Sequence, residues 1–79
     1  MKILLFGKIR EDYSKSEINL EIEENSNFLN ILKSLNIDLS SYKNLMFSLN
    51  KEYISCEYIN TLSIKNTDII ALIPAINAG

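Results

Sequence analysis

The chain has 79 residues, of which 47% are hydrophobic and 23% charged, and its formal net charge is −2 at pH 7. This length allows one packed domain, residues 1–79, and the charge balance provides no basic surface for nucleic acid or for an anionic membrane. Because there is no histidine and only one cysteine, a Ser-His or Cys-His nucleophile, a His/Cys zinc site and an internal disulfide are all excluded. We expect Cys56 to pack as a small hydrophobic side chain. No signal peptide and no membrane-length apolar stretch is visible, so the sequence predicts a soluble, cytoplasmic protein.

The first half of the chain predicts a hairpin followed by a helix. Residues 2–6 are mainly apolar and are closed by Gly7, which is typical of a strand buried on both faces. Residues 18–22 alternate between apolar and polar side chains and predict a second strand, with residues 8–17 as the connecting loop. An apolar stripe at helical spacing then predicts a helix, which Ser26 or Asn27 can cap and Asn36 can end. The residues of this stripe are Phe28, Ile31, Leu32 and Leu35, and the acidic residues before it, Glu17, Glu21, Glu23 and Glu24, are interpreted as a solvated strand face.

The second half predicts further strands. Residues 37–43 fit either a loop or a short helical turn. Residues 46–49 and 52–54 predict two strands joined by the two-residue turn Asn50-Lys51. Residues 61–64 can extend, residues 65–68 form a turn, and residues 69–73 predict a second fully apolar strand.

The two fully apolar strands at the ends of this order are expected to lie side by side in the middle of the sheet. A right-handed crossover would pack the helix on one face of it. The predicted fold class is therefore α+β, a ubiquitin-like β-grasp with a mixed sheet packed on one main helix. Pro74 lacks a backbone donor and ends the pairing, so we expect residues 74–79 to form a flexible, extended C-terminal tail.

Both ends of the chain resemble one known family. The segment Leu5-Phe6-Gly7-Lys8-Ile9-Arg10-Glu11 is similar to the start of the small subunit of molybdopterin synthase, where an apolar strand leads into Phe-Ala or Phe-Gly and then Arg-Glu. Leu49-Asn50 resembles the Val-Asn of that family before its middle turn. The ending Ile73-Pro74-Ala75-Ile76-Asn77-Ala78-Gly79 resembles its pattern of aromatic, two prolines, apolar, small, and two glycines. The resemblance spans the chain, and its specific part lies in the first eleven and last seven residues.

The resemblance implies a sulfur carrier rather than a self-sufficient catalyst. In the family an ATP-dependent adenylyltransferase/sulfurtransferase converts the terminal glycine, here Gly79, to a thiocarboxylate. The tail, here residues 74–79, then enters the large synthase subunit and delivers sulfur to cyclic pyranopterin monophosphate for the molybdenum cofactor. Two large and two small subunits are implied, with no metal or cofactor held by the carrier itself. The residues implied to bind partners are Phe6, Arg10, Tyr53 and Ile73.

Two departures from the family pattern and four alternative interpretations accompany this resemblance. Ala78 replaces the usual glycine and narrows the clearance in a partner's channel, whereas Ala75 replaces the second proline and leaves the tail less stiff. Phe6 and Ile73 could instead belong to a closed core, and Arg10 and Glu11 to a solvated loop. The competing functions are a carrier of the thiamin-pathway type and a β-grasp interaction module whose terminus has no chemistry.

Overall fold

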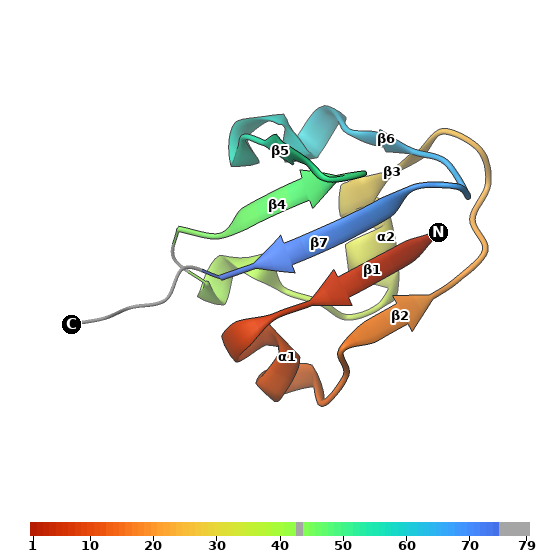
Figure 1. The fold of residues 1–79 in the computed structure, drawn as a ribbon. Helices are drawn as coiled ribbons and strands as arrows, with labels where there is room; N and C mark the ends of the chain where they lie inside the picture. The colour runs from red at the N-terminus through yellow and green to blue at the C-terminus, as the bar shows by residue number, and fades with distance from the viewer. Residues whose placement is uncertain (43, 75–79) are drawn as a thin grey trace.

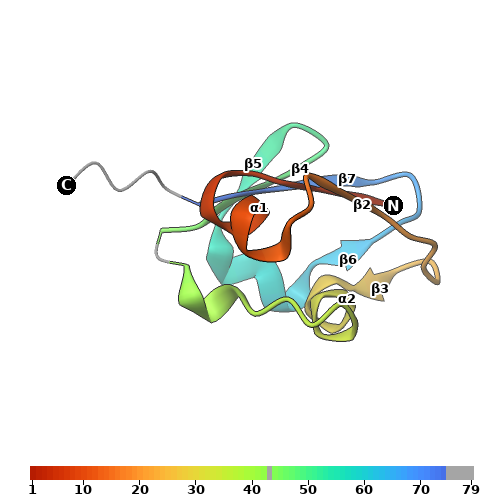
Figure 2. The ribbon, with the colours of Figure 1, turned by 90° about the horizontal axis from the view of Figure 1, so that it is seen from below.

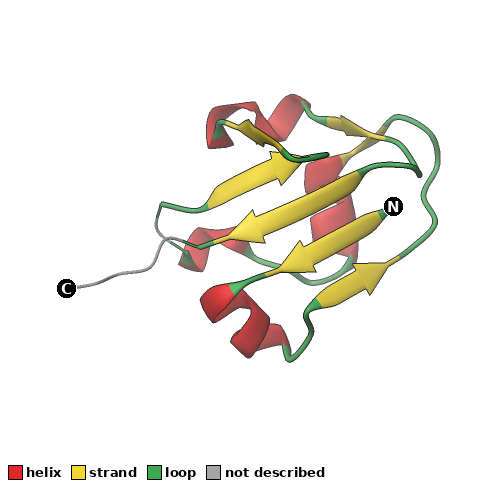
Figure 3. Cartoon of the chain, in the orientation of Figure 1, coloured by secondary structure: helices red, strands yellow, loops and turns green. Residues whose placement is uncertain are grey.

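The fold is built on one mixed five-stranded sheet with a small second sheet and two α-helices (Figures 1 and 3). The structure is a computed structural model, and it describes residues 1–42 and 44–74, except for the side chain of Cys56. The large sheet has the strand order β2-β1-β7-β4-β5, and the small sheet pairs β3 with β6. The elements in chain order are β1 (Lys2–Leu5), α1 (Gly7–Tyr13), β2 (Glu17–Asn19), β3 (Ser26–Asn27), α2 (Phe28–Ser34), the 3₁₀ helix η1 (Leu39–Ser41), β4 (Met46–Leu49), β5 (Glu52–Ile54), the 3₁₀ helix η2 (Cys56–Thr61), β6 (Ser63–Ile64) and β7 (Ile69–Ile73).

The two apolar terminal strands lie next to each other, as predicted. Strands β1 and β7 pair in parallel, with Ile3 opposite Ile70 and Leu5 opposite Leu72. Strand β2 pairs antiparallel with β1, and β4 pairs antiparallel with β7 and β5. The sheet is therefore mixed, and β7 occupies its centre. Together with the helix on one face, this confirms the predicted β-grasp class.

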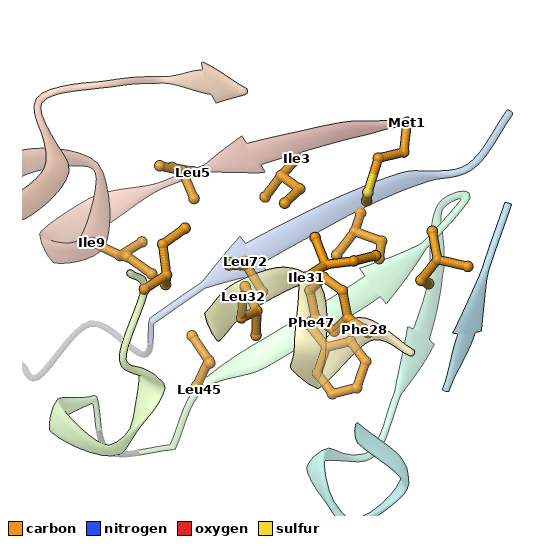
Figure 4. Close-up of a cluster of buried hydrophobic side chains, with 13 residues drawn as sticks. Met1, Ile3, Leu5, Ile9, Phe28, Ile31, Leu32, Leu45, Phe47 and Leu72 are labelled. Carbon is orange, nitrogen blue, oxygen red and sulfur yellow. The ribbon is translucent and has the colours of Figure 1, made fainter. Parts of the chain in front are cut away.

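The core lies between the sheet and α2. Figure 2 shows α2 on one side of the sheet, and Figure 4 shows the side chains of β1, β4 and β7 that converge on that helix. We call this side the inner face. Its strand residues Ile3, Phe47, Ile70 and Leu72 are fully buried, as is Phe28 of α2. The rings of Phe28 and Phe47 lie 6.3 Å apart between centroids, within the range of favourable aromatic pairs.

The predicted ends of helix α2 and the predicted turn between β4 and β5 are confirmed. The Asn27 side chain accepts a hydrogen bond from the Asn30 amide at 3.2 Å and so caps α2. Asn36 has a φ of +58° just after the helix, in the left-handed region common at helix ends. Asn50 and Lys51 both have positive φ, 52° and 71°, as a type I′ hairpin turn requires. Residues 37–43 contain the short helical turn η1, and Asp68 donates its amide to the Lys65 carbonyl in the next predicted turn.

The connection between β1 and β2 differs from the prediction. It contains the helix α1 rather than a loop over residues 8–17. The helix has seven residues and buries one of them, Ile9, so its apolar pattern was too short to stand out. Ser14, with a φ of +54°, ends it.

The second strand is also shorter than the alternation over residues 18–22 predicted. It ends at Asn19, because the backbone of Ile22 pairs with a side chain instead of a strand. The Ile22 amide donates to Asn66 Oδ1 at 2.8 Å, and Asn66 Nδ2 donates to the Ile22 carbonyl at 2.6 Å. The four predicted solvated glutamates, Glu17, Glu21, Glu23 and Glu24, are all exposed, although only Glu17 lies in a strand.

Candidate functional site

The candidate site is the outer face of the sheet, the face opposite α2. Alternation along each strand assigns its members, since successive side chains point to opposite faces. One row crosses the sheet from Leu4 through Ala71 and Ser48 to Tyr53, as the strand registers show. A second row pairs Ile73 with Met46, and Phe6 continues β1 beside it with extended backbone. We use "outer face" for these residues together with Ile69: Leu4, Phe6, Met46, Ser48, Tyr53, Ile69, Ala71 and Ile73.

The outer face is mainly apolar, and four of its eight residues are exposed to solvent. The exposed fraction is 42% for Phe6, 47% for Met46, 70% for Tyr53 and 43% for Ile69. The prediction that the terminal strands are buried on both faces is therefore wrong for the second face. A continuous apolar run does not reveal whether the chain itself covers both faces. Several exposed apolar side chains on one face of a small domain indicate an interaction surface.

Three of the four predicted partner-binding residues meet on this face. Phe6 and Ile73 lie at the end of β1 and β7, and Tyr53 lies two strands away from β7 on the same side. The alternative that Phe6 belongs to a closed core is wrong, whereas Ile73 is half-buried. Arg10 does not join them, because it lies on α1, exposed, where it lines a polar hollow with Gly7, Glu11 and Ser14.

Pro74 marks the point where the described chain leaves the sheet. It follows β7 directly and is buried. The predicted tail residues Ala75, Ile76, Asn77 and Ala78, and the predicted sulfur-bearing Gly79, lie outside the described residues. The end of the sheet that carries Phe6, Met46 and Ile73 is thus also the end at which the chain continues toward Gly79.

Sequence reasoning missed Met46 and Ile69. Both are exposed apolar residues of the outer face. For Met46 the sequence did contain a signal. Phe47 and Leu49 of β4 point toward the core, so alternation along the strand points Met46 to the other face. Ile69 stayed hidden within an unbroken apolar run, which carries no period from which a face can be read.

Charge is confined to the border of this face. Lys2 Nζ lies 3.5 Å from Glu17 Oε1 on the two neighbouring strands β1 and β2. The Asn19 side chain donates to the Glu17 carboxylate, and this bond, with the charge of Lys2, lowers the pKa of Glu17. The centre of the face presents apolar side chains and the buried hydroxyl of Ser48.

The described part of the chain shows no arrangement for metal or membrane binding. Within residues 1–42 and 44–74, apart from the Cys56 side chain, no three His, Cys, Asp or Glu side chains come close enough to hold a metal ion. No helix in this part is long and apolar enough to cross a bilayer. The described residues do place an exposed apolar surface beside the point where the chain leaves the sheet.

Comparisons with known proteins agree with this architecture. A family model described as the ThiS family matches residues 3–79. No curated protein matches the chain. The fold is similar to SAMP1 from Haloferax volcanii, with a TM-score of 0.77 at 18% identity, covering 100% of this chain and 98% of that one.

Two further solved structures share the fold. The thiamine biosynthesis protein ThiS from Geobacter metallireducens has a TM-score of 0.61 at 16% identity, with 100% of both chains covered. A chain from the complex of subunits 1 and 2 of molybdopterin-converting factor from Helicobacter pylori 26695 has a TM-score of 0.60 at 18% identity. In that case 99% of this chain and 96% of the other are covered. These likenesses establish the ubiquitin-like β-grasp fold of this chain.

Proposed function

This chain belongs to the ThiS family of ubiquitin-like sulfur carriers, and from that premise we propose that it is the sulfur-carrying small subunit of a molybdopterin synthase. The observation that carries the proposal is the outer face, an open apolar surface at the end of the sheet from which Pro74 leads toward Gly79. The similarity of residues 5–11 and 73–79 to that subunit favours it over other carriers. The Helicobacter pylori structure, a complex of two subunits, offers a precedent for a partner on such a chain.

In this proposal the Gly79 carboxylate is the working group. A carboxylate is a poor electrophile, so an activating enzyme first transfers AMP from ATP to it and releases pyrophosphate. A sulfur donor then displaces AMP and leaves a thiocarboxylate, whose sulfur is a good nucleophile. Glycine suits this end of the chain because it has no side chain to crowd either attack.

The reach of the tail follows from chain geometry. Residues 74–79, if fully extended, span up to about 20 Å at about 3.3 Å per residue. The outer face would dock against the large subunit while Pro74, Ala75, Ile76, Asn77 and Ala78 carry Gly79 to its buried site. There the sulfur would pass to cyclic pyranopterin monophosphate, in an assembly of two large and two small subunits. ATP belongs to the activating partner, so the carrier itself would bind no cofactor.

A thiamin-pathway carrier is the second candidate. The description of the matching family and the fold shared with Geobacter metallireducens ThiS favour it. Both candidates require the same chemistry at Gly79, and they differ in the protein that receives the sulfur. A β-grasp interaction module with an inert terminus is the third reading.

One experiment separates carriers from the inert module. The protein is incubated with its activating enzyme, ATP and a sulfur donor, and its intact mass is measured. We expect the mass to rise by the difference between one sulfur and one oxygen atom. A variant that lacks Gly79 should keep its thermal stability and show no such rise. An unchanged mass of the full chain with the cognate enzyme would contradict the proposal.

A genetic test then separates the two carriers. We expect the gene to restore molybdenum-cofactor synthesis in cells that lack the synthase small subunit, and the variant without Gly79 to fail. Rescue of a thiamin auxotroph alone would assign the chain to the second candidate. Co-purification of a synthase large subunit, reduced by a charge placed on the outer face, would support the first.

A further inference from the structure

Pro74 is held against the first residue of α1. A Cβ built on Gly7 would lie 3.7 Å from Cδ and 3.8 Å from Cγ of Pro74, which is ordinary van der Waals distance. The bare Cα of Gly7 therefore faces the proline ring, and Pro74 is buried. Gly7 has a φ of +58°, a backbone conformation that residues other than glycine rarely adopt. The last described residue of the chain thus has a defined seat on α1.

The first turn of α1 is also joined to β7 by the backbone. The Phe6 amide donates to the Leu72 carbonyl at 3.2 Å, and the Arg10 amide donates to the Phe6 carbonyl at 3.4 Å. Figure 1 shows α1 beginning where β1 and β7 end. A shift of α1 would therefore move the seat of Pro74.

Side chains join the rest of α1 to the two residues that flank η1. The Tyr42 hydroxyl donates to Asp12 Oδ2 at 2.6 Å, and Lys8 Nζ lies 3.1 Å from Asp12 Oδ1. The Asp38 amide donates to the Tyr13 hydroxyl at 3.0 Å. The bonds to Asp38 and Tyr42, the burial of Ile9 and the packing of Tyr13 on the core together hold α1 in place, whereas the ion pair of Lys8 lies within the helix.

The bond between Tyr42 and Asp12 affects the titration of both groups. It is the main cause that lowers the pKa of Asp12, to which Lys8 adds. Burial, and then the bond to Asp12, raise the pKa of Tyr42. Asp12 is therefore ionised and Tyr42 protonated near neutral pH, which are the states that this hydrogen bond needs.

We propose that α1 is the positioning element for the C-terminal tail, with Gly7 as the seat of Pro74 and with Asp12 and Tyr42 as positioning residues that act through α1. The inference rests on the proposed function, because it concerns how the carrier presents Gly79 to its partners. The contacts form a continuous path from Tyr42 to Asp12, along α1 to Gly7, and on to Pro74. Neither Tyr42 nor Asp12 belongs to the outer face.

The test uses Tyr42→Phe, which removes the hydroxyl donor and keeps the ring. Tyr58→Phe, the same change at an exposed residue of η2, is the matched control. Thiocarboxylate formation by the activating enzyme is followed as a function of carrier concentration. Because each substitution removes only one hydroxyl and keeps the ring, we expect the KM for the carrier to stay within experimental error in both variants. We expect kcat to fall about fivefold in Tyr42→Phe, the effect of losing one hydrogen bond of average strength at an exposed site, and to stay unchanged in Tyr58→Phe.

This split distinguishes positioning from loss of fold. Partial unfolding lowers the amount of competent carrier, which raises the apparent KM and leaves kcat unchanged. Asp12→Ala should reproduce the fall in kcat, since it removes the same contact from the other partner. A wild-type kcat in both Tyr42→Phe and Asp12→Ala would overturn the inference.

A second measurement does not depend on sulfur transfer. Hydrogen exchange of the Phe6 amide, which is bonded to Leu72, is measured in the isolated carrier. We expect Tyr42→Phe to speed this exchange about fivefold and to leave amides of α2 unchanged. If Tyr42→Phe leaves the exchange of the Phe6 amide unchanged, the positioning role is overturned, whatever the sulfur-transfer assay shows. If instead the wild-type protein accepts no sulfur, only the proposed function is overturned.

Discussion

The two faces of the sheet have similar composition and different tasks. The inner face places Ile3, Phe47, Ile70 and Leu72 against α2, where they are fully buried. The outer face carries side chains just as apolar, and yet Phe6, Met46 and Tyr53 remain open to water. Burial from solvent is the source of apolar stabilisation, so only the inner face contributes strongly to folding. The difference teaches that hydrophobicity alone does not mark the core, and it leaves the outer face free for the association proposed above.

The largest effect should come from truncation on the inner face. Phe47→Ala removes a ring that is fully buried beside Phe28, so we expect the free energy of unfolding to fall by about 3–5 kcal/mol. Its neighbour on the same strand, Met46→Ala, should change that free energy by no more than about 0.5 kcal/mol. Chemical denaturation of both variants checks the contrast. Equal losses at the two positions would erase the distinction between the faces.

An intermediate effect should appear on the outer face, and in binding rather than folding. Met46→Asp places a charge on the proposed interface, at the end of the sheet near Pro74, where it would be desolvated on binding. We expect the dissociation constant for the large synthase subunit to rise at least tenfold, or about 1.4 kcal/mol, with little change in thermal stability. Asn30→Asp, which places a similar charge at an exposed position of α2, is the control and should bind normally. Isothermal titration calorimetry measures both, and normal binding by Met46→Asp would place the interface elsewhere.

The smallest effect on stability should come from lowering the pH, which protonates carboxylates that lie on neither face of the sheet. Asp12 has a lowered pKa, chiefly because it accepts the Tyr42 hydroxyl. Its ionised form therefore stabilises the fold above its unfolded value, near 3.8, and this contribution is lost as the pH falls through the lower folded value. Asp12→Asn should lose less stability than the wild type when denaturation is followed from about pH 7 to about pH 2. Glu24→Gln, which removes the same charge from an exposed loop, should follow the wild-type curve in parallel.

The sequence predicted what short-range chemistry controls. The cap at Asn27, the left-handed residue Asn36 and the turn at Asn50-Lys51 each depend on neighbours within a few positions. The pairing of β1 with β7 was also predictable, because two apolar strands both seek the interior of a sheet. Such local signals fixed the order of the main elements.

Longer-range contacts produced the errors. Helix α1 is held by Asp12 and Tyr13 through bonds to a segment some 25 to 30 residues away, which no local pattern reveals. The early end of β2 depends on Asn66, 44 residues from Ile22. At the candidate site, Phe6 and Tyr53 were predicted from the family resemblance. The exposure of Met46 could be recognised only from the alternation along β4, and that of Ile69 only from the complete sheet. The roles of Gly79 and the tail stay predictions.

The edges of the sheet also affect how this protein behaves at high concentration. Both outermost strands, β2 and β5, contain only three residues, and each starts with a glutamate, Glu17 or Glu52. Short, charged edges are poor templates for strand addition by another chain. With longer and uncharged edge strands, unbound copies of such a domain could pair edge to edge and form fibrils. The edges thus give the free carrier protection against polymerisation, and that protection leaves the apolar face available for docking.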